Sequence, residues 1–328
     1  MAVFHQSCRT SVIALALELL LVSGSLALGA ELKKMQIAFP SYTMEQLPYQ
    51  LAAKRGYFKE EGLIPELISM RSTTIAMALA SQNLLYSSAG TTAIQAAMSG
   101  VDAKVLWVAS AKTLMFLLVR PEIKQLSDLR DKRVGVSGIG GASDIAVRAM
   151  LGTASINPRE VTIIAIGPTE SRLLALKTGA IDATPLIPPQ SLQAEALGFK
   201  NLGFMGDLVP NAFGGLGISS AALSHETKMV EAVVRIGIKG LMLMKRDRSF
   251  TLKIMQAFTK IQDPELAGRT YDVNIGYFTD DGIISEKEQQ GILEESKREL
   301  KVDKPIAPGI FDFSLAMKVK KELAGWRP

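Results

Sequence analysis

Cysteine and histidine, the side chains that most metal sites and covalent catalysts use, are almost absent from this sequence. Cys8 is the single cysteine, and His5 and His225 are the only histidines. A structural zinc site needs about four such ligands, and a disulfide framework needs pairs of cysteines. A serine–histidine–aspartate triad would depend on His225, which we place near the start of a surface helix. The sequence therefore predicts no catalytic residue and no metal site.

The glycine patterns that hold nucleotide cofactors are also missing. Gly138 and Gly140 follow a predicted strand and precede a helix, but Ser143 stands where a dinucleotide-binding loop has its third glycine. The next predicted strand ends in glycine and proline, with no acidic residue to bind a ribose. No phosphate-binding Gly-x-x-x-x-Gly-Lys motif is present. We therefore expect no cofactor.

Long runs of like charge do not occur either. Lysine and arginine total 37 against 32 aspartates and glutamates, and they are scattered, with Lys33-Lys34 and Lys245-Arg246 only as pairs. Nucleic-acid-binding domains concentrate basic residues on one face or tail. We expect no nucleic-acid partner, and a weakly positive field that slightly favours an anionic solute.

The one marked apolar run lies near the N-terminus. It extends from Val12 to Val22, follows Arg9 and precedes a stretch of small residues, although it contains one glutamate. This order is typical of a secretory signal peptide, and the run is shorter than the roughly 20 apolar residues that span a bilayer. We predict that residues 1–30 are a signal peptide and that the mature chain, without a thiol, is soluble outside the cytoplasm. The alternative is an amphipathic or buried N-terminal helix.

From Met35 onward, short apolar runs alternate with helical patterns, and after residue 221 the pattern becomes almost purely helical. The β-α-β-α order predicts a largely parallel sheet with helices on both faces. A second unit of the same kind begins near Pro121, inside a chain that starts and ends elsewhere. We therefore expect two α/β lobes, with residues 31–120 and 215–328 forming lobe 1 and residues 121–214 forming lobe 2.

Four segments in order resemble the nitrate/sulfonate/taurine-type substrate-binding proteins of ABC transporters, which are similar to thiamine-precursor synthases. They are Leu47-Pro-Tyr-Gln-Leu-Ala-Ala-Lys-Arg-Gly-Tyr-Phe-Lys-Glu-Glu-Gly-Leu63, Ser127-Asp-Leu-Arg-Asp-Lys-Arg-Val-Gly-Val136, Leu174-Ala-Leu-Lys-Thr-Gly-Ala-Ile-Asp-Ala183 and Glu195-Ala-Leu-Gly-Phe-Lys-Asn-Leu202. One stretch departs from the family pattern, because Ser81-Gln-Asn-Leu-Leu-Tyr86 lacks its glycine and aspartate. The resemblance implies a type II periplasmic-binding-protein fold, in which two α/β lobes close over a ligand. It also implies a periplasmic location, an inner-membrane ABC permease as partner and a monomeric state.

The candidate ligand-binding residues are those in the turns that follow the predicted strands, because ligands of open parallel sheets sit beyond the carboxyl ends of the strands. These turns combine hydroxyl groups with glycines that open helices, and such helix N-termini suit carboxylate or sulfonate groups. The alternative is that they are ordinary turn and cap residues. The candidates are Ser41, Tyr42, Ser88, Gly90, Thr91, Ser137, Gly140, Ala142, Ser143 and Pro185.

The function that these features favour is capture of a small, anionic organic solute and its delivery to an ABC permease. The turns offer no arginine or lysine clamp, so an organic acid, a sulfonate or a heterocycle is favoured over nitrate or sulfate. One alternative is an enzyme on the same fold that acts on a small acid or a pyrimidine precursor. The synthases of that kind carry a cysteine-rich motif, which is absent here. The other alternative is a stand-alone solute sensor.

Overall fold

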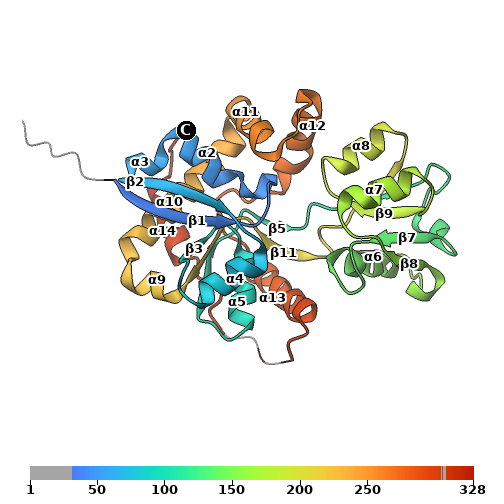
Figure 1. Cartoon of the computed structure of the whole chain (residues 1–328), viewed down its shortest axis with the longest axis horizontal. Coiled ribbons are helices and arrows are strands. Elements are labelled where there is room, and N and C mark those ends of the chain that lie inside the picture. The colour runs from blue at the N-terminus through green and yellow to red at the C-terminus, as the bar shows by residue number, and fades with distance from the viewer. Residues whose placement is uncertain (1–31, 304, 306–307) are drawn as a thin grey trace, which may run out of the picture.

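Two five-stranded sheets form the two ends of the molecule (Figure 1). The computed structural model describes residues 32–303, 305 and 308–328. The predicted signal peptide, residues 1–30, lies outside the described residues. None of the described helices is long and apolar enough to cross a membrane.

The sheet of the first lobe has the strand order β2-β1-β3-β12-β4. Its strands are β1 (Lys33–Phe39), β2 (Leu63–Ser69), β3 (Tyr86–Ser87), β4 (Ala103–Trp107) and β12 (Leu216–Ser219). Strand β1 runs parallel to β2 and β3, whereas β12 runs antiparallel to both of its neighbours. The turns after β1 and β3 therefore meet at one edge of the sheet.

The sheet of the second lobe has the order β10-β6-β9-β7-β8. Its strands are β6 (Phe116–Val119), β7 (Arg133–Val136), β8 (Thr162–Ala165), β9 (Ala183–Leu186) and β10 (Lys200–Phe204). Strand β7 is parallel to β8 and β9, whereas β6 is antiparallel to β9 and β10. Read from the opposite edge, this is the arrangement of the first sheet, with β6 in the place of β12.

The chain crosses between the lobes twice, through β5 (Ser110–Lys112) and β11 (Pro210–Phe213), which pair antiparallel (Figure 1). In each sheet, the antiparallel strand is the one that has just arrived from the other lobe. This differs from our expectation for residues 116–119, which we placed in lobe 1 and which pair in the second sheet. The apolar run that contains β6 suits the interior of either sheet, so its composition does not reveal where the chain crosses.

Most helices belong to the first lobe. They are α2 (Leu47–Arg55), α3 (Tyr57–Glu60), α4 (Ser72–Ala80), α5 (Gly90–Met98), α9 (Ser220–His225), α10 (Thr227–Arg246), α11 (Arg248–Thr259), α12 (Pro264–Asn274), α13 (Glu286–Leu300) and α14 (Ser314–Glu322). The second lobe contains α6 (Ala142–Thr153), α7 (Thr169–Lys177) and α8 (Gln190–Ala196). Short 3₁₀ turns are η1 (Met44–Gln46), η2 (Leu126–Leu129), η3 (Pro158–Glu160) and η4 (Ile275–Tyr277). Figure 1 shows α12 on the side of the first lobe that faces α8.

The Gly-Tyr-Phe segment of the first family motif has a structural role. Helix α2 ends at Gly56, whose φ of 93° lies in the left-handed region that favours glycine. Tyr57 and Phe58 follow at once and are both buried. The Tyr57 ring packs edge-on against Trp326, with 5.7 Å between ring centroids. This motif therefore builds the first lobe and lies away from the strand ends that face the other lobe.

The hydrophobic core is divided at the same place as the sheets. One cluster of buried side chains draws on residues 35–114 and 212–323. Two smaller clusters draw on residues between 115 and 209. Each lobe thus has its own core, which is the condition for the lobes to move as separate bodies.

Candidate functional site

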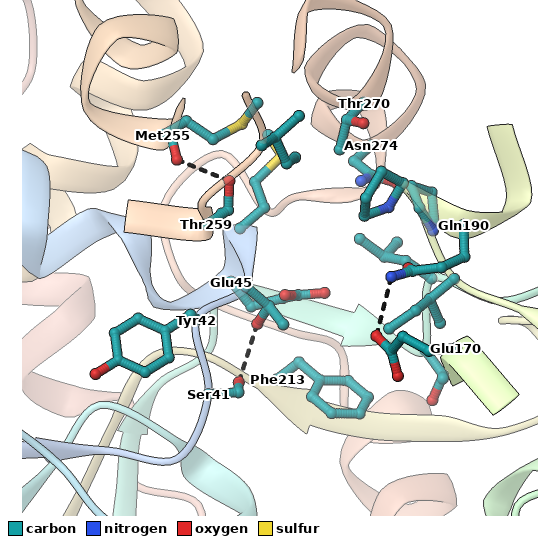
Figure 2. A pocket seen from close by; sticks show the side chains of 18 residues that line it. Ser41, Tyr42, Glu45, Glu170, Gln190, Phe213, Met255, Thr259, Thr270 and Asn274 are labelled. Atoms are coloured by element: carbon teal, nitrogen blue, oxygen red, sulfur yellow. Dashed lines mark hydrogen bonds between the residues drawn. The ribbon is translucent and has the colours of Figure 1, made fainter. Parts of the chain in front are cut away.

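A cavity of about 310 Å³ lies between the two lobes, and residues of both lobes line it (Figure 2). The first lobe contributes the turn after β1 and helices α11 and α12. The second lobe contributes the start of α7 and the turn after β9, and residues beside the crossing strands complete the wall. The lining residues are Ser41, Tyr42, Thr43, Met44, Glu45, Thr113, Leu114, Glu170, Ile187, Pro188, Pro189, Gln190, Phe213, Met255, Thr259, Ile261, Thr270 and Asn274.

Tyr42 forms an aromatic wall of this cavity. Its ring meets the Phe39 ring edge-on at 5.3 Å and the Phe258 ring at 5.2 Å, measured between centroids. The side chain is still 47% exposed. Lys260 Nζ lies 5.3 Å from the ring centroid. Because packing against β1 and α11 holds the ring, Tyr42 offers a preformed apolar surface to a ligand.

Carboxylates supply the charge at this site. Glu45 is partly buried, and this burial raises the pKa of its carboxyl, while hydrogen bonding with Thr43 opposes the rise. In Figure 2 the Glu45 side chain lies in the space between Tyr42 and the residues of the second lobe. Glu170, on α7 of the second lobe, is exposed and accepts a hydrogen bond from Gln190 Nε2 at 3.0 Å. The described residues that line the cavity include no lysine or arginine.

Helix α12 brings two buried polar side chains to the wall. Thr270 and Asn274 are four residues apart, so they share one face of the helix, and they are 4% and 3% exposed. Within the described part of the chain, neither Thr270 Oγ1 nor Asn274 Oδ1 has a hydrogen-bond partner. Most buried polar atoms in folded proteins have one. Two orphaned oxygens on residues that line a cavity indicate groups that a bound molecule would satisfy.

The lobes also touch beside the cavity. The ring of Phe204, from β10, stacks on the ring of Tyr277, from η4, with 4.3 Å between centroids and 16° between planes. Arg269 of α12 lies 3.9 Å from Glu195 of α8. These contacts join α12 and its continuation to the second lobe, so a change at α12 acts on the orientation of the lobes.

Two of the ten predicted site residues, Ser41 and Tyr42, line the cavity. Ser88 is buried in the first lobe and donates to Gln46 Oε1 at 2.5 Å. Gly90 begins α5, where a Cβ atom would come within 2.9 Å of Ala212 Cβ, so its role there is close packing. Thr91 follows it in the first turn of α5 and is not among the lining residues.

The predicted residues of the second lobe are not among those that line the cavity. Pro185 is buried in β9, and its carbonyl oxygen accepts from Arg172 Nη1 at 2.8 Å. Ser137 and Ser143 satisfy each other, with 2.7 Å between their Oγ atoms. Because β7 is parallel to β9, the loop that holds these serines opens at the same sheet edge as the turn that lines the cavity.

The first turn of the helix that follows this loop already contains an anion. The buried Asp144 accepts from the Gly140 N–H at 2.7 Å and from Arg148 Nε at 2.8 Å. Ala142 begins helix α6 beside it. A helix N-terminus that would attract an external carboxylate or sulfonate is thus partly neutralised by a side chain of the protein itself.

Sequence reasoning missed most of the cavity wall. Thr270 and Asn274 belong to the C-terminal helical half, in which the resemblance gave no residue-level motif. Their spacing of four on a helix was the one available signal. Glu45, at the start of a helical segment, reads as an ordinary partner of the helix dipole.

A protein-family model described as NMT1/THI5 like matches residues 43–233. No curated protein matches the chain. Among solved structures, the periplasmic sulfonate-binding protein SsuA from Methylobacillus flagellatus KT is similar, with a TM-score of 0.72 and 15% identity over 90% of this chain and 96% of that one. The periplasmic nitrate-binding protein NrtA from Synechocystis PCC 6803 has a TM-score of 0.64 and 14% identity over 89% of each chain.

An enzyme shares the fold as well. The desulfurization enzyme DSZB has a TM-score of 0.69 and 12% identity, over 88% of this chain and 99% of that one. At such low identities the likeness establishes the fold. The expected two-lobed periplasmic-binding-protein fold is thereby confirmed, and so is the resemblance to the sulfonate- and nitrate-binding proteins.

Proposed function

The chain belongs to the NMT1/THI5-like family, and from this premise we propose that it is a solute-binding protein that captures a small organic molecule between its lobes. The observation that carries the proposal is the cavity of about 310 Å³ lined by both lobes. This volume is at the small end of the range that ligand pockets span, roughly 300–1,000 Å³. A solute of modest size would contact both lobes at once.

Capture follows from the two crossings. A molecule that contacts Tyr42 and Asn274 in the first lobe and Gln190 in the second is bound by both lobes only when they are close together. It therefore stabilises the closed arrangement by the difference between its affinities for the two arrangements. Strands β5 and β11 are the only connections between the described parts of the lobes, so bending there accommodates the movement.

Delivery to an ABC permease extends this proposal. Similar structures include periplasmic sulfonate- and nitrate-binding proteins, one of them described as part of a sulfonate ABC transporter. A periplasmic location and an inner-membrane ABC permease as partner fit these relatives and the apolar N-terminal segment, and we further propose a monomeric state. A pull-down of the permease with liganded and ligand-free protein tests this step, because delivery requires the liganded form to bind more tightly.

The solute has to suit the wall that the structure describes. We expected an anionic solute because glycine-rich turns follow the strand ends and open helices, whose N-termini favour anions. The cavity itself is lined by Glu45 and Glu170 and by no lysine or arginine among the described residues. This wall therefore does not match an anionic solute.

An enzyme on this fold is the second candidate. The desulfurization enzyme DSZB shares the architecture, and Glu45 has a raised pKa, as a general acid or base requires. A bound molecule that is converted, rather than released unchanged, would identify this activity.

The deciding experiment is a thermal-shift screen of the purified protein against a library of small amines, acids, sulfonates, alcohols and heterocycles. A ligand at 100 times its Kd adds about 2.7 kcal/mol to the free energy of unfolding, which raises the Tm visibly. Hits are then incubated with the protein and analysed by mass spectrometry. An unchanged hit supports a binding protein, a consumed hit supports an enzyme, and a library without any hit contradicts solute capture.

A further inference from the structure

The charged groups on the cavity wall are all carboxylates, which accept hydrogen bonds. Glu45 and Glu170 present carboxylates, and the orphaned atoms of Thr270 and Asn274 are both oxygens. An ionised carboxylate accepts hydrogen bonds and donates none. A ligand that matches this wall must bring donors, and it must bring positive charge if it is to offset the carboxylates.

Three cationic side chains near the cavity are not among its lining residues. Arg172 donates to the Pro185 carbonyl at 2.8 Å and to Thr169 Oγ1 at 3.0 Å, and it is not among the lining residues. Lys260 packs on the ring of Tyr42. Lys112 pairs with Asp207 at 2.6 Å. None of these three lines the cavity, so an anionic ligand would meet Glu45 without a compensating cation.

We propose that the solute carries a protonated nitrogen, as an amine, amidine or guanidine does, and that this group binds to Glu45 while the apolar body of the solute packs against Tyr42. This inference rests on the proposed function, because it names the class of solute that the same cavity captures. Thr270 and Asn274 accept further N–H donors, and Glu170 lies on the second lobe, where closure adds its charge.

The physical reason is the cost of burying the Glu45 carboxylate without a cation among the lining residues. The cavity holds the carboxyl in surroundings that disfavour its charged form, which is seen in its raised pKa. An ammonium or amidinium group restores the missing charge partner and forms charge-assisted hydrogen bonds. A carboxylate or sulfonate would instead add a like charge to a site that already disfavours one.

Matched probes that differ only in charge test this inference. One set is benzamidine, benzamide and benzoate, and the other is pentylamine, pentanol and pentanesulfonate. Both sets are placed inside the broad library of the previous subsection, and binding is measured by thermal shift and calorimetry at pH 7.5. The cationic member of each set is expected to bind more tightly than its neutral and anionic counterparts.

Charge-neutral variants provide the second arm. Glu45→Gln keeps the shape of the side chain and removes its charge, so it should weaken the cationic probes by about 10- to 100-fold. Glu170→Gln, at the exposed edge, should weaken them less. Glu294→Gln on α13 makes the same change in net charge at an exposed position outside this cavity and should leave affinity unchanged.

The pH dependence gives a third, independent readout. Glu170 of α7 faces the site, Lys260 lies beside Tyr42, and Arg269 and Glu195 lie at the α12–α8 contact. Protonation of Glu45 competes with a bound cation, so affinity for benzamidine should fall as the pH is lowered through the raised pKa of Glu45. The Glu45→Gln variant should lose this dependence.

The outcomes separate the two proposals. If anionic or neutral molecules bind and Glu45→Gln does not weaken them, the inference about charge is wrong and solute capture still holds. If cationic hits appear but Glu45→Gln binds them as tightly as the unaltered protein, Glu45 is not their partner and the inference is also wrong. If no member of the library binds, both proposals fail.

Discussion

Folding favours the neutral form of the Glu45 carboxyl group, whereas the proposed binding of a cation requires its charged form. Burial raises its pKa, so the folded state holds the proton more tightly than the unfolded chain does. Between the ordinary carboxyl pKa and the raised value, unfolding therefore releases a proton, and the stability falls as the pH rises through this window. Above the raised pKa, the stability lost through Glu45 no longer changes with pH. A binding group that weakens the empty protein is typical of functional sites.

Glu45→Gln should therefore be more stable than the unaltered protein at neutral pH. Glutamine has no charged form, so the pH-dependent loss disappears. We expect a Tm higher by about 1–3 °C at pH 8 and nearly equal Tm values at pH 4, where both side chains are neutral. Calorimetric melting curves of both proteins from pH 4 to 8 provide the measurement. A lower Tm at pH 8 would show that the carboxylate stabilises the fold.

A second prediction concerns Thr270. Its hydroxyl oxygen is buried and has no partner within the described residues, so replacement by the isosteric valine removes an unsatisfied group and no hydrogen bond. Thr270→Val should leave the Tm of the empty protein unchanged or slightly higher, and it should weaken solute binding by about 3- to 10-fold. The control is Thr251→Val, because the buried Thr251 hydroxyl donates to the Met244 carbonyl. That change should lower the Tm and spare binding.

Individual residues were predicted unevenly from the sequence. Ser41 and Tyr42, which follow the end of β1, line the cavity. Ser88 and Ser143 follow strands in the same way, but their hydroxyls bond to Gln46 and Ser137, inside their own lobes. Position after a strand therefore indicates the edge of the sheet, while the direction of the side chain depends on packing that a single sequence does not contain.

At the scale of elements, glycines in α10 show how the first lobe is assembled. Helix α10 packs against α2, and a Cβ atom at Gly240 would lie 2.0 Å from the Pro48 carbonyl oxygen. A Cβ atom at Gly237 would lie 2.5 Å from Cζ2 of the Trp107 ring. The two glycines allow the helices to approach closely, and no other residue fits without separating them.

Gly240→Ala should therefore destabilise the protein by about 1–3 kcal/mol, as overpacked interiors generally do. The matched control is Gly152→Ala in helix α6, where a Cβ atom would meet nothing within 4 Å. There alanine should be neutral or stabilising by up to about 1 kcal/mol, because glycine is a poor helix former. Urea unfolding curves of the two variants measure both effects, and equal effects would contradict the packing argument.

The elements themselves were largely predictable, and the crossings were not. Alternating apolar and helical runs indicated the β-α-β-α order. Strand β6 was placed in the wrong lobe because its four residues are buried and apolar in a way that suits both sheets. The contribution of α12 was missed because a single sequence does not show that this helix lies against the second lobe.

At the scale of the whole molecule, the sheets of the two lobes have the same strand arrangement. Each sheet contains an antiparallel strand delivered by the crossing pair β5 and β11. The cavity lies beside this pair, so small rotations there change its width directly. The stack of Phe204 on Tyr277 is one of the contacts that hold the lobes in the present orientation.

Loss of this stack should shift the lobes apart. Phe204→Leu keeps an apolar side chain but removes this pair, and also the pair with Phe116 of the same lobe at 5.3 Å, each worth about 0.5–1.5 kcal/mol. If the stack favours the closed arrangement, the apparent affinity for a solute should fall by about 2- to 10-fold, because a smaller fraction of the protein is competent to bind. The radius of gyration of the empty protein, measured by small-angle X-ray scattering, should rise, and saturating solute should restore it.

Phe311→Leu is the matched control, because Phe311 pairs with Phe313 at 5.7 Å within the first lobe. It should lower stability and leave both affinity and radius of gyration unchanged, and a Phe204→Leu variant that behaves in the same way would show that the stack supports the fold rather than the closure.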